Sequence, residues 1–269
     1  MKTNMSKLKT LGTAVLALSA FAWTGVSADI STTPHNLGSG GPGPNTFGGT
    51  AEVCVFCHTP HGGDTSAAVP LWNRTLAAPA SYTTYSTTSS SSVDGAVAAV
   101  GSVSIACLSC HDGTQSMDVL INTPGSGTDP AGFSASSTWT GNSTPQVLAL
   151  IGQNLRDDHP IGIQYGGGGV TVGTPTGPMN DGDFFDPQSQ VINGTTVWWV
   201  DTIGGTAAVR EKTDMQLYTR DETLATPPIA GGPQPFVECA SCHDPHSNNV
   251  TFLRVVNTGS AVCLTCHNK

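Results

Sequence analysis

A five-residue phrase occurs four times in this chain: two cysteines separated by two residues, with a histidine directly after the second cysteine. The copies span residues 54–58, 107–111, 239–243 and 263–267, and we call them motifs one to four. Together they contain all eight cysteines of the 269-residue chain, so none is left over for another purpose. Any fold of this chain must be compatible with these four phrases.

The phrase C-x-x-C-H is the attachment signature of c-type haem. The two thiols add to the haem vinyl groups as thioethers, and the histidine binds the iron from the same side. Four disulfides or zinc ribbons are the alternatives for eight cysteines, but neither explains a histidine after every second cysteine. The sequence therefore predicts four covalently attached haems, held by Cys54, Cys57 and His58; Cys107, Cys110 and His111; Cys239, Cys242 and His243; and Cys263, Cys266 and His267.

Four histidines lie outside these positions, at 35, 61, 159 and 246, and the chain has eight in all. Four irons with two axial histidines each need eight, so we expect His35, His61, His159 and His246 to be the distal ligands of low-spin, bis-histidine haems. The alternative is that some are ordinary surface or core histidines. A methionine ligand, from Met117, Met179 or Met215, would give a haem of higher potential.

His61 and His246 each follow a motif histidine by three residues, in His-x-Pro-His. Two histidines on opposite sides of one iron need Cα atoms well over roughly 10 Å apart, since each metal–nitrogen bond is roughly 2 Å long. Three extended residues reach only roughly 10–11 Å, and the thioethers hold the segment on one face. We therefore expect His61 and His246 to bind neighbouring haems, which would bring those haems close together.

Residues 1–28 have the features of a signal peptide. Three lysines precede an apolar run from Leu11 to Trp23, and small residues end at Ala28. The run is too short to predict a membrane span. We expect cleavage after Ala28 and export of residues 29–269 to the cell surface or beyond it, the periplasm being the alternative.

We expect residues 29–269 to form one tetrahaem domain with a motif-free insert at about 112–238. Hydrophobic residues make up only 38% of the chain and aromatic residues 6%, while glycine counts 32 and proline 18. This composition predicts a mostly irregular polypeptide around a tetrahaem core. A short helix is expected over 145–151, and a hairpin with an Asn193-Gly194 turn over 191–200.

The chain is acidic, with a formal charge of −9 that becomes −12 when the three leader lysines are removed. Binding to nucleic acid requires a basic face, so this charge argues against that class of function. An acidic surface also repels other acidic proteins. Any self-association must therefore come from specific contacts.

The four motifs, the x-Pro-His extensions, the Asp-Asp-His-Pro around His159 and the early His35 resemble the multihaem c-type cytochromes. More closely, the layout is similar to that of the OmcE-type tetrahaem cytochromes, which polymerise into extracellular nanowires. The resemblance implies bis-histidine haems in a continuous chain, with one axial histidine donated by the neighbouring subunit. His35 lies near the mature N-terminus and motif four near residue 269, which suits head-to-tail association. We expect His35 to be the donated ligand, the alternative being that it binds its own first haem.

These features predict electron transfer rather than enzymatic catalysis. The expected partners are other copies of the chain in a head-to-tail polymer, redox proteins, and extracellular acceptors such as metal oxides. The alternative is a monomeric periplasmic electron shuttle. A multihaem reductase of a small oxyanion fits less well, because catalysis needs an open coordination position and every histidine is assigned as a ligand.

Overall fold

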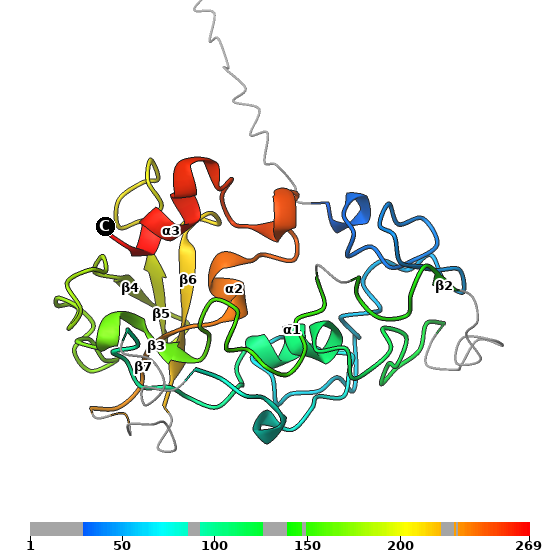
Figure 1. The fold of residues 1–269 in the computed structure, drawn as a ribbon, viewed down its shortest axis with the longest axis horizontal. Helices are drawn as coiled ribbons and strands as arrows, with labels where there is room; N and C mark the ends of the chain where they lie inside the picture. The colour runs from blue at the N-terminus through cyan, green and yellow to red at the C-terminus, as the bar shows by residue number, and fades with distance from the viewer. Residues whose placement is uncertain (1–28, 86–91, 126–138, 147–148, 222–228, 230) are drawn as a thin grey trace, which may run out of the picture.

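The computed structural model describes residues 29–85, 92–125, 139–146, 149–221, 229 and 231–269. The predicted leader, residues 1–28, lies outside these residues. The described chain is mostly irregular, with a few short helices and two small sheets (Figure 1). This confirms the irregular, helix-poor part of the predicted fold. Among the described residues, no helix is long and apolar enough to cross a membrane.

Three of the four motifs lie on α-helices: α1 (Ser104–His111), α2 (Cys239–Cys242) and α3 (Ala261–Cys266). Short 3-10 helices occur at Ile30–Thr32, Pro79–Ser81, Tyr165–Gly167, Val250–Phe252 and Thr258–Ser260. The helix expected over 145–151 is described only in part. Its described residues show a single turn, in which the Ala149 N–H donates to the Gln146 carbonyl at 2.8 Å.

The larger sheet has five antiparallel strands in the order β3-β7-β6-β5-β4. The strands are β3 (Ile163–Gln164), β4 (Gln188–Ile192), β5 (Thr195–Val200), β6 (Met215–Arg220) and β7 (Gln234–Val237). Strands β4 and β5 form the predicted hairpin, with Ile192 opposite Thr195. Asn193 and Gly194 have φ of +50° and +78°, as a type I′ turn requires. The hairpin prediction is confirmed.

The sheet is larger than the sequence predicted, and it has a hydrophobic core of its own. Trp198, Val200, Met215 and Leu217 are buried there against Tyr165. Residues alternate along β6, where Met215 and Leu217 point inward. The expectation that polypeptide mainly coats the haems therefore does not describe this region, since strands of the insert pack on one another.

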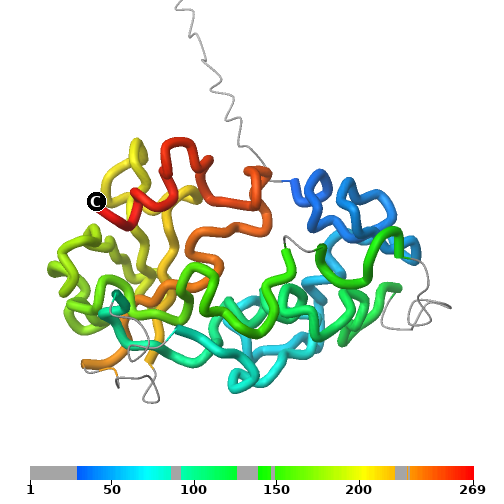
Figure 2. Tube along the Cα trace, viewed as in Figure 1, coloured from blue at the N-terminus to red at the C-terminus, as the bar shows by residue number. Residues whose placement is uncertain are grey.

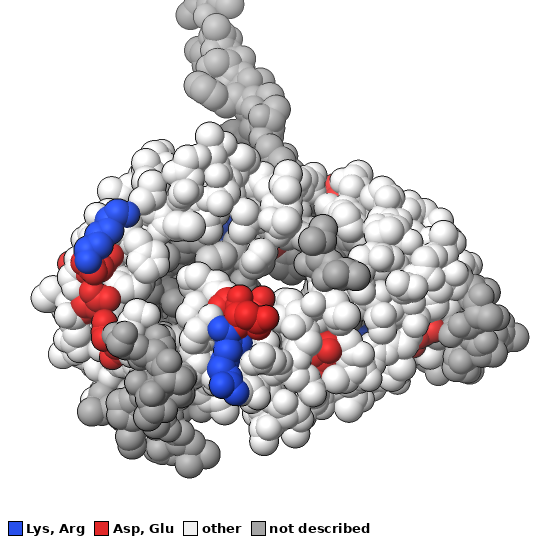
Figure 3. Space-filling model, viewed as in Figure 1, with Lys and Arg blue, Asp and Glu red and all other residues white. Residues whose placement is uncertain are grey.

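The rest of the described chain surrounds α1 as loops. A two-stranded sheet joins β1 (Thr46–Phe47) to β2 (Trp139–Thr140). Figure 2 follows the trace from these loops, blue to green, into the sheet and back through the orange segment of motif three to motif four, in red. In Figure 3 the face seen from this side carries few charged side chains and is hollowed near its middle.

Candidate haem-binding site

Each described motif folds as a tight turn, which explains its spacing. The N–H groups of His58, His243 and His267 donate to the carbonyl of the first cysteine of their motif at 2.8, 3.1 and 2.9 Å. In motif two the same residues form the last turn of α1. Positions i, i+3 and i+4 lie on one face of such a turn. Both thiols and the imidazole can therefore reach one flat group from the same side.

Backbone carbonyls orient the imidazoles of three motifs. Nδ1 of His58 lies 2.9 Å from the Pro70 carbonyl, Nδ1 of His111 lies 2.6 Å from that of Ala149, and Nδ1 of His243 lies 2.8 Å from that of Thr251. A carbonyl can only accept, so Nδ1 carries the proton and Nε2 keeps its lone pair. Histidines that bind metals are usually held in this way. The residues present therefore fit the axial ligation of haem.

The second cysteine of each motif packs against a hydrophobic cluster. Cys57 and Cys110 contact the cluster of Phe47, Phe56 and Met117, while Cys242 and Cys266 contact the sheet core. Burial raises the pKa of the Cys57 and Cys266 thiols to about 12 and that of Cys242 to about 11. These thiols are thus kept neutral and anchored at the edge of the protein core.

Two motif histidines face a histidine from elsewhere in the chain. The rings of His58 and His246 have centroids 6.4 Å apart and planes at 12°. The rings of His35 and His111 have centroids 6.0 Å apart and planes at 64°. Two imidazoles on opposite sides of one iron have centroids about 6 Å apart, because each metal–nitrogen bond is about 2 Å long. Both centroid separations are of this size, which makes these two pairs the candidates for bis-histidine ligation.

His35 is held beside His111 by the segment that follows motif three. Its ring stacks on Phe252, with centroids 4.0 Å apart and planes at 10°. The Pro245 carbonyl lies 3.5 Å from its Nδ1. Burial lowers the pKa of His35 to about 4, and the charge of His111 adds to this. The imidazole is therefore neutral near pH 7, the form that binds iron.

The other two predicted distal ligands are exposed and are not paired in this way. His159 donates from Nδ1 to the Pro160 carbonyl at 3.1 Å. Although the side chain is exposed, partial desolvation by the surrounding atoms lowers its pKa, and the charges of His267 and His243 lower it further. His61 lies in the loop after motif one, where its carbonyl accepts from the Asn122 amide at 2.9 Å.

A buried polar network joins motif two to motif three. The Ser104 hydroxyl donates to Glu238 at 2.5 Å and accepts from the Cys239 N–H at 2.9 Å. Oε1 of Glu238 also forms an ion pair with Nη1 of Arg220, at 2.5 Å. The thiols of Cys107 and Cys239 hydrogen-bond each other, which raises the pKa of Cys107 and lowers that of Cys239. The first cysteines of motifs two and three are thus side by side.

The three methionines considered as ligands lie in hydrophobic clusters. Met117 is buried beneath motif two, and Met179 and Met215 lie in the sheet core.

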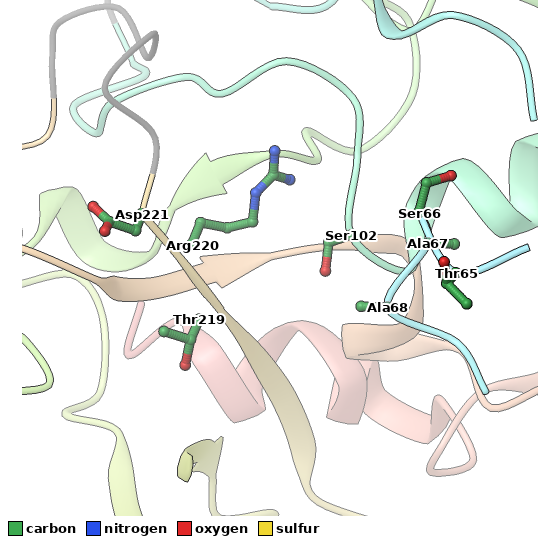
Figure 4. A pocket seen from close by; sticks show the side chains of 8 residues that line it. All are labelled: Thr65, Ser66, Ala67, Ala68, Ser102, Thr219, Arg220 and Asp221. Atoms are coloured by element: carbon green, nitrogen blue, oxygen red, sulfur yellow. The ribbon is translucent and has the colours of Figure 1, made fainter.

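A cavity of about 380 Å³ lies between the Thr65–Ala68 loop and the end of β6 (Figure 4). Hydroxyl and methyl groups line most of it, with Arg220 and Asp221, and no motif residue lines it. This cavity is not part of the haem-binding site.

All eight cysteines are free thiols in the structure. Within the described part of the chain, no three or more histidine, cysteine or acidic residues gather into a cluster that could hold a bare metal ion. A zinc ribbon would require such a cluster. The four motifs are instead spread over separate turns, each of which presents its own thiols and imidazole.

Comparison with known proteins agrees with this geometry. Residues 227–269, which contain motifs three and four, match the family model described as the doubled CXXCH motif. This segment has the character of a multihaem c-type cytochrome. The motifs indicate covalently attached haem c, and with it electron transfer. No curated protein matches the chain.

Two residues important to this site had not been singled out from the sequence. Phe252 stacks on His35, and Arg74 donates into motif two. Neither belongs to a recognisable motif. Arg74 stands out in the sequence only as a charged residue in a largely apolar stretch, and this gave no indication of where its side chain points.

Proposed function

We propose that the chain is an exported tetrahaem c-type cytochrome that transfers electrons through four low-spin, bis-histidine haems. The observation that carries this proposal is the pairing of His58 with His246 and of His35 with His111 at 6.4 and 6.0 Å. Bound haem supplies a one-electron iron couple. The chain supplies thiols on one face of a turn, imidazoles of fixed orientation, and a network that keeps motifs two and three adjacent.

The pairings lead to an assignment of distal ligands. His246 would serve the haem of motif one, and His35 that of motif two. His159, whose pKa responds to His267 and His243, would serve motif three or motif four. His61 is then left for the remaining iron. Each assignment uses a histidine from outside the motif that it serves, as the distance argument for His-x-Pro-His requires.

We further propose that the chain polymerises head-to-tail and carries electrons to extracellular acceptors such as metal oxides, receiving them from redox partner proteins. The resemblance to filament-forming cytochromes supports this. His35 faces His111 of its own chain, so the donated ligand is better sought in His61, which is exposed and unpaired within the described chain. This replaces His35 as the candidate for ligation between subunits.

A second candidate is a monomeric periplasmic shuttle. It is favoured by the position of His35 within its own chain, because this removes the simplest link between copies. A reductase of a small oxyanion would need an open iron position. With eight histidines available for four irons, we propose no catalytic residue.

The first experiment is to measure the mass and the absorption spectrum of the purified, exported protein. We expect four haem additions and a purely low-spin spectrum. Fewer additions, or a five-coordinate high-spin haem, would contradict the tetrahaem bis-histidine assignment.

Negative-stain microscopy of wild type, His61→Ala and His35→Ala then separates filament from shuttle. Fibres that disappear with His61→Ala but persist with His35→Ala would support ligation by His61 between subunits. Dispersed particles in all three samples would favour the shuttle and leave the haem assignment intact.

A further inference from the structure

Strand β4 forms an open edge of the five-stranded sheet. The order β3-β7-β6-β5-β4 gives it a single neighbour, β5 (Figure 1). The opposite edge is covered, because the Gln164 N–H of β3 donates to the Ala96 carbonyl at 2.9 Å and the Ala98 N–H donates to the Gly162 carbonyl at 2.7 Å. Among the described residues, no segment pairs with the outer side of β4 in this way.

The hairpin turn determines which backbone groups of β4 point away from the sheet. Because the turn has two residues, the flanking pair of Ile192 and Thr195 is a hydrogen-bonded pair. Along an antiparallel ladder such pairs alternate with pairs that are not hydrogen-bonded. The N–H and C=O groups of Ser189 and Val191 therefore face outward. In the described part of the chain these outward groups have no hydrogen-bond partner.

The edge lacks the features that usually keep other strands away. Charged side chains, bulges and very short strands are the common forms of protection. Strand β4 has five residues, pairs with β5 without a bulge and carries no charge. The side chain of Val191 is 67% exposed. Ser189 contacts a neighbouring loop through its side chain, whose Oγ donates to the Pro175 carbonyl at 3.1 Å, and its backbone remains available.

The outward groups of β4 are complementary to those of a second copy. When two β4 strands lie antiparallel about a twofold axis through Gln190, Ser189 of each copy lies opposite Val191 of the other. Each such pair exchanges two hydrogen bonds. All outward N–H and C=O groups of Ser189 and Val191 are then satisfied in both copies. Pro187 has no N–H and would lie opposite the turn, so the pairing ends there without an unsatisfied donor.

Charge favours an identical strand over a foreign one at this edge. The chain is acidic, and its copies repel one another over most surfaces. Residues 187–200, which include the whole β4–β5 hairpin, carry no charged side chain, so two copies can approach there. A neutral edge also offers no ion pair to a basic foreign strand. On the twofold axis the two Gln190 carboxamides would face each other and can form a hydrogen bond.

We propose that β4 is a self-association edge, at which two copies of the chain pair antiparallel about Gln190 and join their sheets into one. Two short strands bury little surface, so the pairing should be reversible. The inference goes beyond electron transfer. A shuttle would become a dimer, and filaments would associate side by side. Because a twofold contact is closed, it adds no length to a head-to-tail polymer.

The test is amide hydrogen exchange of the haem-loaded full chain, measured by mass spectrometry at increasing protein concentration. In wild type, exchange of residues 187–194 should slow as the concentration rises. Val191→Pro should weaken the pairing about thirtyfold, because it removes an outward donor from each copy and keeps the hydrogen bonds between β4 and β5. Exchange that does not depend on concentration in wild type would overturn the proposal.

Charges at Gln190 test the axis and keep the backbone intact if Val191→Pro does not mature. Gln190→Lys and Gln190→Glu should each weaken self-pairing about fivefold, because like charges meet across the strands. An equimolar mixture of the two variants should restore pairing, and failure to restore it would overturn the twofold register. Val209→Lys adds the same charge at an exposed residue outside the strand and should pair as wild type.

The absorption spectrum separates this inference from the proposed function. All variants should keep the low-spin spectrum of wild type, since β4 carries no motif residue. A high-spin haem in wild type would contradict the proposed function and leave the concentration dependence of exchange as the test of pairing.

Discussion

The ring centroids of His58 and His246 lie 6.4 Å apart and the ring planes are nearly parallel, although His58 ends motif one and His246 follows motif three. His246 thus lies beside the histidine of a motif other than the one that it follows in sequence. The pair of His58 and His246 therefore connects segments that lie far apart in the chain. It implies that an iron at motif one would also tie the third motif to the first.

The variant His246→Ala tests this pair. We expect one of the four low-spin haems to become five-coordinate and high-spin, because the iron at motif one loses its second ligand. Electron paramagnetic resonance would detect the change. His246→Met is the matched control, since methionine can still bind iron and should raise the potential of one haem instead. An unchanged low-spin spectrum in His246→Ala would place the ligand elsewhere.

Phe252 should control the ligation of the second haem. In Phe252→Ala the stack on His35 is lost, so this imidazole should dissociate more easily and one haem should bind carbon monoxide faster. Phe252→Tyr keeps the ring and should behave as wild type. Rates measured by stopped-flow absorption would check this. Equal carbon monoxide binding in all three proteins would mean that the stack does not position His35.

The buried ion pair of Arg220 and Glu238 should be essential to the polar network that joins motif two to motif three. Glu238→Gln removes the carboxylate that pairs with the buried Arg220 guanidinium, and the expected loss is about 3–5 kcal/mol of unfolding free energy. The double variant Arg220→Met with Glu238→Leu should recover part of it. Denaturation of the haem-loaded protein would measure both losses.

The exposed pair of Lys269 and Asp183 supplies the control for that comparison. Asp183→Asn should change stability little, because solvent screens an exposed pair. If Glu238→Gln lowers the free energy of unfolding no more than Asp183→Asn does, the buried pair does not stabilise the contact between motifs two and three.

The β4–β5 turn should depend on glycine at 194. Its φ is +78°, and no atom lies within 4 Å of the position of an added Cβ. Gly194→Ala should therefore cost about 1–2 kcal/mol through backbone strain alone. Gly182→Ala is the control, since that site is equally open but lacks a positive φ. Thermal denaturation would compare them, and equal midpoints would contradict the turn assignment.

The sequence alone determined the chemistry of attachment and one local structure. Each C-x-x-C-H places its thiols and imidazole within one turn, so its geometry is local and can be predicted from spacing. The Asn193-Gly194 hairpin is local in the same sense, because two residues with positive φ dictate a tight reversal. The prediction that His61 and His246 serve haems of other motifs rests on chain reach, which is likewise a local property.

Tertiary structure decided everything that joins distant segments. The partner of His246, the position of His35 beside His111, and the burial of Arg74 depend on long-range packing that leaves no periodic signal. The sequence predicted only the β4–β5 hairpin of the five-stranded sheet, because the pairing of the other strands also depends on long-range packing. Strand β3 is only two residues long, and β7 pairs with both β3 and β6 across long stretches of chain. Their order is set by burial of the Trp198 core and not by local preference.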